Sequence, residues 1–202
     1  MARSREGLAV ALALVAGCSV GAGEGRVDGT VRDVACRVDV PDYHMRPDFF
    51  SADVIEDRGA LGGTARMLRI RIQRGSYRES DSDGLVFLVH DVDRIARESL
   101  GRPLPLGPAG APRIDATLYL NETCTSGFPD RFWTVPSIVE VASGEITFES
   151  IYAPDLDPSN TEIRAHFSGE FLDPTAPLDR VARIEGEFDF FYQRGRPAQV
   201  FP

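Results

Sequence analysis

Lysine is absent from this chain of 202 residues, and basic residues as a class are few. All 22 of them are arginine, against 31 Asp and Glu, and the formal net charge is −9. A protein that binds nucleic acid neutralises phosphate with a basic surface, so this balance argues against nucleic acid as a partner. The same balance argues against docking of the folded body on anionic lipid.

Long apolar runs and several ligand-binding motifs are also missing. No run of about 18 apolar residues occurs, so no segment is predicted to span a membrane as a helix. A phosphate loop requires lysine and is therefore excluded, and no G-x-G-x-x-G sequence is present. The three histidines, His44, His90 and His166, lie too far apart in the sequence to form a local metal site. On these grounds we name no catalytic residue.

The N-terminal region carries an export pattern. Arg3 and Arg5 precede an apolar run from Gly7 to Ala16. Ten helical residues extend roughly 15 Å, half of a bilayer core, so the run predicts a cleaved signal peptide. The sequence Leu-Val-Ala-Gly-Cys at 14–18 follows, with small residues directly before Cys18. This arrangement resembles the lipobox of bacterial lipoproteins.

The resemblance implies a location and an anchor, and it extends over only about the first 25 residues. It implies cleavage before Cys18, lipidation of that cysteine and, because Ser19 follows, an outer-membrane location in a Gram-negative envelope. The alternative is an ordinary secretory signal in which Cys18 is incidental. We predict a signal peptide at 1–17, a flexible tether at 18–25 and one domain at 26–202. The choice between the periplasmic and the surface face stays open.

The two other cysteines are Cys36 and Cys124. Neither belongs to a C-x-x-C motif, and neither has a histidine at metal-ligand spacing. Two remaining cysteines in an oxidising envelope predict a disulfide.

Alternation of apolar and polar residues dominates the rest of the chain. It is clearest at 161–171 and 184–192, and it recurs at 68–72 and 114–120. Each such segment predicts a strand with one buried face, whereas the continuously apolar Leu85–His90 predicts a central strand. The only helix candidate is Val92 to Leu100. We predict an all-β fold, an antiparallel β-sandwich of about seven or eight strands with at most one short helix.

Two regions are predicted to be long loops that carry function, Pro41–Ala65 and Gly101–Pro112. A glycine next to a glutamate also recurs before an apolar residue, at Gly144, Gly169 and Gly186. We interpret this recurrence as three neighbouring strands that place glycine beneath a facing aromatic ring or at a bend. The segments at 161–171 and 184–192 are expected to pair as adjacent antiparallel strands, and the alternative is a connection that crosses to the facing sheet.

The sequence patterns that indicate binding residues are weak. Asp81 and Asp83, two apart and before a glycine, are typical of the start of a calcium loop, although His90 stands where a closing Glu would be. A polar hairpin turn explains the same residues without an ion. Aromatic and polar side chains that could bind a glycan or a peptide are Tyr43, His44, Phe49, Phe50 and Trp133. Their alternative role is to fill the open ends of the sandwich.

These observations favour a lipid-anchored envelope protein that binds a protein or a glycan, or has a structural role, without catalysis. The first alternative is a barrel-like carrier of a small apolar ligand. The second is a calcium-dependent hydrolase, for which the three histidines would have to cluster. Calcium is the only cofactor that any motif indicates.

Overall fold

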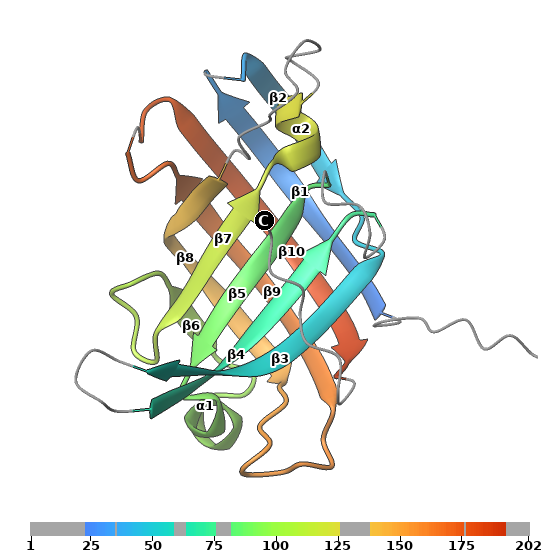
Figure 1. The fold of residues 1–202 in the computed structure, drawn as a ribbon, viewed down its shortest axis with the longest axis vertical. Coiled ribbons are helices and arrows are strands. Elements are labelled where there is room, and N and C mark those ends of the chain that lie inside the picture. The colour runs from blue at the N-terminus through green and yellow to red at the C-terminus, as the bar shows by residue number, and fades with distance from the viewer. Residues whose placement is uncertain are drawn as a thin grey trace, which may run out of the picture.

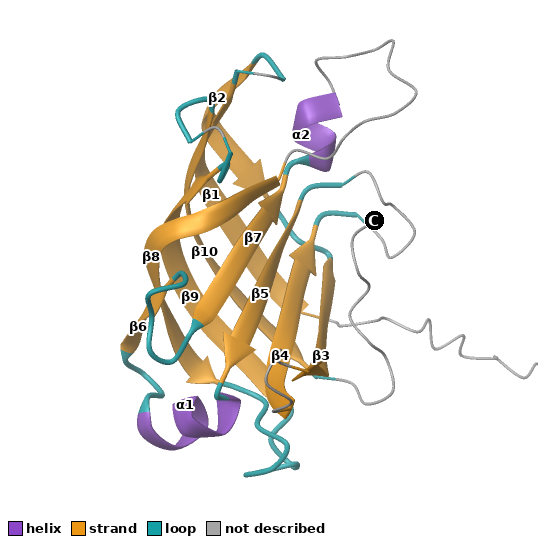
Figure 2. Cartoon of the chain, turned by 60° about the vertical axis from the view of Figure 1, so that its left-hand side comes forward, coloured by secondary structure: helices purple, strands orange, loops and turns teal. Residues whose placement is uncertain are grey.

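The computed structural model describes residues 23–34, 36–58, 64–75, 82–125, 138–175 and 177–192. These residues form ten strands and two short helices (Figures 1 and 2). In chain order they are β1 (Gly23–Asp33), β2 (Val38–Met45), β3 (Phe49–Arg58), β4 (Thr64–Gln73), β5 (Gly84–His90), α1 (Val92–Glu98), β6 (Pro103–Leu106), β7 (Ile114–Tyr119), α2 (Asn121–Thr125), β8 (Ile138–Ser150), β9 (Glu162–Leu172) and β10 (Arg180–Phe191). Neither helix has the length and apolar character that crossing a membrane requires. The predicted all-β antiparallel class is confirmed.

All ten strands belong to one antiparallel sheet. Its order is β2-β1-β10-β9-β8-β7-β5-β4-β3, and β6 pairs with β8 beside this path. The two edge strands, β2 and β3, are consecutive in the chain, so the sheet curls until its ends approach each other. The sequence predicted two packed sheets, whereas the structure has one sheet whose two sides face each other (Figure 1).

Aromatic rings fill the space that the curled sheet encloses. Phe87 of β5 lies 5.1 Å from Phe167 of β9 and 5.6 Å from Phe188 of β10, measured between ring centroids. Phe50 of β3 lies 5.6 Å from Phe190 of β10. All these rings are buried. Opposite sides of the sheet are therefore held together by direct ring packing, which contributes beyond simple area burial.

The alternating segments of β9 and β10 behave as predicted. In β9, Ile163, Ala165, Phe167 and Phe171 are buried, while the side chains between them face outward. β10 pairs antiparallel with β9, with Gly186 opposite Phe167 and Phe188 opposite Ala165. The predicted adjacency of these two strands is confirmed, and the helix predicted at 92–100 is α1.

The recurrent glycines occupy three neighbouring strands, as interpreted from the sequence. Gly144 and Gly169 are paired across β8 and β9. A Cβ on Gly186 would lie 2.8 Å from a ring atom of Phe167, and one on Gly144 would lie 2.3 Å from the Ser168 carbonyl oxygen. Glycine is needed at these positions because a side chain would collide with a ring or with the adjacent strand.

The two predicted loops are wrong, since both contain strands. Residues 41–65 provide the end of β2, all of β3 and the start of β4. Pro41 is tolerated because β2 is an edge strand and the β1–β2 register shifts beside it. In β6, Leu104 and Leu106 are buried while Pro103 and Pro105 face outward, so this edge strand also accommodates proline.

The predicted disulfide between Cys36 and Cys124 is present, with the two Cα atoms 5.3 Å apart. It links the β1–β2 connection to α2, a helix that the sequence pattern did not indicate. Asp33 is fully buried beside the disulfide. Its carboxylate accepts a hydrogen bond from the backbone N–H of Cys36 at 2.9 Å and forms an ion pair with Arg180 at 2.7 Å. The pair satisfies a buried carboxylate that would otherwise be costly.

The predicted tether is too long at its C-terminal end. β1 begins at Gly23, and Gly23 to Gly25 pair with Phe190 to Phe188 of β10. The ring of Phe50 contacts this segment, since a Cβ on Gly23 would lie 3.1 Å from one of its atoms. Packing against an aromatic ring thus explains how a glycine-rich segment joins the sheet. Cys18 lies outside the described residues.

Candidate functional site

The predicted aromatic binding residues do not form one surface. Tyr43 and Phe50 are both buried, and Phe50 belongs to the core. The Tyr43 hydroxyl donates a hydrogen bond to Asp83 at 3.1 Å. Burial first, and then the Asp83 charge, raises the pKa of Tyr43 well above its usual value. These two side chains stabilise the fold, which agrees with their alternative role as filling residues, and Trp133 lies outside the described residues.

Phe49 is also buried, on the outer side of β3, where it lies beneath a cation. The guanidinium of Arg71 lies 5.4 Å from the centroid of the Phe49 ring. Strand alternation predicted Arg71 on a wet face, but the side chain is only 2% exposed. Burial lowers the pKa of Arg71 to about 10. The cation–π contact and a hydrogen bond to Gln73 offset part of the desolvation.

His44 is the one predicted binding residue that is described and exposed. Its ring nitrogens lie 2.6 Å from Asp28 and 3.0 Å from Asp42. The hydrogen bond with Asp28, and then the charge of Asp42, raises the pKa of His44. The other two histidines contact different carboxylates. His90 lies beside Asp115, and His166 lies beside Glu149, whereas His44 contacts Asp28 and Asp42. The described contacts therefore do not join the three histidines into one centre.

Asp83 has a structural position. Its carboxylate accepts hydrogen bonds from the backbone N–H groups of Glu122 at 2.9 Å and Thr123 at 3.0 Å, and from the Thr123 hydroxyl. It therefore holds the first turn of α2. Burial raises the pKa of Asp83, although these hydrogen bonds oppose the shift. Asp81 lies outside the described residues, so calcium binding by this pair stays a prediction.

Among the described residues, one group of possible metal ligands lies close together, namely Asp33, Cys36 and Cys124. Both sulfur atoms are used in the disulfide. They provide no thiolate for a metal ion.

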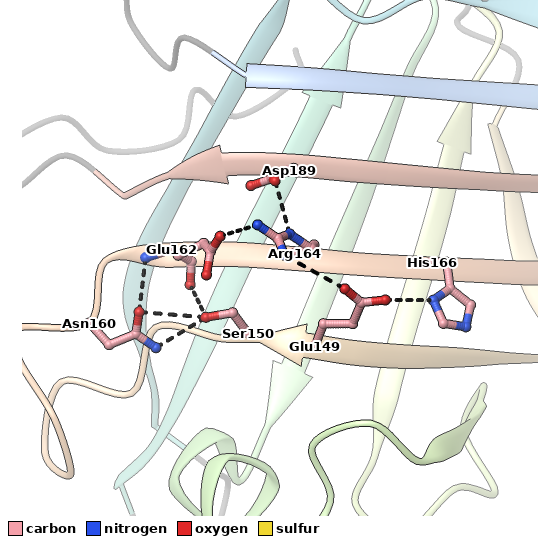
Figure 3. A network of polar contacts seen from close by, with 7 residues as sticks. All are labelled: Glu149, Ser150, Asn160, Glu162, Arg164, His166 and Asp189. Carbon is pink, nitrogen blue, oxygen red and sulfur yellow. Dashed lines mark hydrogen bonds and ion pairs between the residues drawn. The ribbon is translucent and has the colours of Figure 1, made fainter.

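The outer face of β8, β9 and β10 is a ladder of charge pairs (Figure 3). Arg164 lies between Glu162, Asp189 and Glu149, with its Nε 2.9 Å from the Asp189 carboxylate. His166 lies 3.8 Å from Glu149. Such exposed cross-strand pairs each contribute little, and they satisfy one another. We assign this face to solvation and strand register.

A different surface, at the end of the sheet that carries α1, is hollowed into a groove of about 660 Å³. We call it the α1 groove. Its mostly buried floor consists of apolar side chains from β3, β4, α1 and the segment after β8, namely Val54, Met67, Leu68, Val92, Tyr152 and Pro154. Four arginines surround this floor, Arg66, Arg94, Arg97 and Arg113. The volume and the mixed lining are typical of ligand sites.

The arginines of the groove come from distant parts of the chain. Met67 pairs with His90, so the start of β4 lies beside the end of β5 and the helix that follows it. Arg66 forms an ion pair with Asp155, which raises the pKa of Arg66. Arg94 lies 3.3 Å from Glu98 on the same helix. Arg97 is exposed and forms no ion pair with any described residue.

Two further features lie in the α1 groove. His90 lies 3.6 Å from Asp115, which also accepts a hydrogen bond from Arg113 at 2.7 Å. Asp91 directly before α1 has φ 52° and ψ 42°, a left-handed conformation that is uncommon for a residue with a Cβ. Its side chain makes no capping hydrogen bond, so helix capping does not explain it. Such conformations concentrate at functional sites.

Sequence reasoning predicted α1 but missed the groove. The lining residues fall in five separate segments, and Arg66 lies between the predicted loop 41–65 and the strand predicted at 68–72. Only the pairing of β4 with β5, which depends on long-range contacts, brings Arg66 to α1. Comparison with known proteins adds no assignment, because no protein-family model, no curated protein and no solved structure matches this chain.

Proposed function

We propose that this chain is a lipid-anchored protein of the outer membrane and that its β domain is a binding module. The α1 groove is the binding site, and it receives an anionic group, a phosphate or a carboxylate, carried by an envelope ligand. The observation that carries this proposal is the gathering of four arginines around an apolar floor. Guanidinium groups form paired hydrogen bonds with carboxylates and with phosphates.

Arg97 distinguishes this site on a chain that is acidic overall. The other three arginines of the groove pair with carboxylates, Asp155, Glu98 and Asp115. Arg97 is exposed and forms no ion pair with any described residue. Arg97 therefore offers local attraction for an anion, whereas the other three arginines would have to exchange their carboxylate partners for it.

The carrier alternative receives no support from the described core, because aromatic rings occupy the interior of the curled sheet. The hydrolase alternative also receives no support, because the described contacts of the three histidines do not join them into one centre. The aromatic residues predicted to bind a ligand, Tyr43, Phe49 and Phe50, are buried. The proposal therefore places the binding site in the α1 groove instead.

The anchor is tested by Cys18→Ser. Without the thiol there is no lipid attachment, so we expect the variant to lose metabolic palmitate labelling and to be a folded protein that is soluble or unprocessed. The Cys36–Cys124 disulfide should still form, because it belongs to the folded domain. Palmitate labelling of Cys18→Ser equal to that of the parent protein would remove the anchor from the proposal.

The groove is tested with inorganic pyrophosphate as a minimal anion, titrated calorimetrically into the Cys18→Ser protein. Replacing Arg94 and Arg97 with glutamine should weaken binding by about tenfold or more, since each charged hydrogen bond contributes about 1.5–3 kcal/mol. Arg183→Gln is the matched control, because Arg183 is 73% exposed and pairs with Glu170 on the outer face of β10. Equal weakening by both variants, or no binding at all, would contradict the proposal.

A further inference from the structure

We propose that the α1 end of the domain docks on the bilayer surface, and that the anion in the α1 groove is a lipid headgroup. This inference rests on the proposed function and names the ligand of the same site. It is carried by exposed apolar side chains at this end and by the point where the chain enters the sheet.

Three of the exposed large apolar side chains in the described structure lie at this end. They are Leu100 at 41% exposure, Leu156 at 43% and Phe191 at 56%. The backbone N–H of Gly101 donates a hydrogen bond to the Phe148 carbonyl at 2.8 Å, which places Leu100 beside the end of β8. Phe191 pairs with Glu162, the first residue of β9, and Leu156 lies in the connection between β8 and β9.

The connection that carries Leu156 is fixed in place by hydrogen bonds. The Asn160 amide donates to the Ser150 hydroxyl at 3.2 Å (Figure 3). It also donates to the Ile151 carbonyl at 3.3 Å. The Asn160 side-chain oxygen accepts from the backbone N–H of Glu162 at 3.2 Å. Leu156 is therefore presented on a held segment whose neighbours Pro154 and Asp155 line the α1 groove.

The chain enters the sheet at the same end. Gly23, the first residue of β1, pairs with Phe190, next to Phe191. Cys18 precedes Gly23 by five residues, and five extended residues reach at most roughly 18 Å. A lipid on Cys18 therefore holds this end within reach of the membrane surface and keeps the opposite end away from it.

The chemistry of this end suits a bilayer. Leucine and phenylalanine side chains are favoured at the boundary between headgroups and acyl chains. The arginines of the α1 groove offer hydrogen-bond donors at the depth of the lipid phosphates. Carboxylates also lie at this end, among them Asp155 in the α1 groove and Glu162 opposite Phe191. The acidic balance of the chain opposes docking on anionic lipid, so the docking depends on the apolar side chains and on the arginines of the groove.

The first experiment places a fluorophore on the lipidated protein in liposomes of phosphatidylethanolamine and phosphatidylglycerol. Leu156→Cys provides a labelling site, because Cys36 and Cys124 are bonded and Cys18 carries lipid. Nitroxide-labelled lipids should quench a fluorophore at position 156 severalfold more than one introduced through Leu178→Cys. Leu178 is 87% exposed in the connection between β9 and β10, at the opposite end of these strands. Equal quenching at the two positions would overturn the inference.

The second experiment tests docking without the anchor. The Cys18→Ser protein should co-float with the same vesicles, and replacing Leu100, Leu156 and Phe191 with serine should abolish flotation. Leu178→Ser is the matched control and should float normally, with circular dichroism confirming the fold of every variant. Flotation that the triple replacement leaves unchanged would overturn docking. If docking fails while pyrophosphate still binds through Arg94 and Arg97, the proposed binding site stands without the membrane surface.

Discussion

Phe188→Ala should lower the free energy of unfolding by about 3–5 kcal/mol, as truncation of a core phenylalanine does. Phe188 is 1% exposed and lies 5.6, 6.3 and 6.1 Å from the rings of Phe87, Phe167 and Phe190. Removing it leaves a cavity at the point where the two sides of the curled sheet meet. A loss of this size is a large part of typical domain stability. Chemical denaturation of the Cys18→Ser form provides the measurement.

Glu187→Ala is the matched control on the adjacent residue. The Glu187 side chain is 59% exposed and forms an exposed ion pair with Arg26 at 3.1 Å. Its removal should cost less than about 0.5 kcal/mol. Similar losses for the two variants would mean that the assigned register of β10 is wrong.

Replacing both Cys36 and Cys124 with serine should lower stability by about 4 kcal/mol. The bond closes a loop across 88 positions of sequence, and the chain-entropy model gives this magnitude for such a loop. The position of α2 should also loosen, since the disulfide and Asp83 hold the helix together. Thermal unfolding of the variant and of the parent protein, each with and without reductant, measures the effect.

In that experiment a reductant should destabilise the parent protein and leave the serine variant unchanged. A difference below about 1 kcal/mol between the two proteins would show that the bond does not constrain the unfolded chain in the way the entropy model requires.

The sequence allowed the β strands with clear alternation to be predicted, because one buried face imposes a period of two. β9, β10, β7 and β4 follow from that pattern, whereas the connection between β9 and β10 allowed either the adjacent pairing that the structure has or a crossing to a facing sheet. β3 was missed even though Phe50, Ala52 and Val54 alternate, because its residues were assigned to the predicted loop Pro41–Ala65. The contacts that hold β3 in the sheet join residues that are far apart in the sequence. They are its pairing with β4 and the contacts of the Phe50 ring with β1 and β10.

The site was less predictable than the fold. Exposed aromatic residues and buried ones look alike in sequence, so Tyr43, Phe49 and Phe50 were placed on a binding surface. In the structure Tyr43 lies against Asp83, Phe49 lies beneath Arg71, and Phe50 lies in the core. The α1 groove depends instead on which strand ends meet, and no local pattern encodes that meeting. The left-handed backbone of Asp91 is equally invisible in a sequence that reads as an ordinary helix start.

NMR of the arginine side chains during a pyrophosphate titration tests the proposed binding site most directly. In the isotope-labelled Cys18→Ser protein, the Nε–Hε resonances of Arg66, Arg94, Arg97 and Arg113 should shift together and saturate. Those of Arg26, Arg164 and Arg183, on the outer face of β1, β9 and β10, should stay unchanged. Saturable shifts on that face with none at the α1 groove would contradict the assignment of the groove as the binding site.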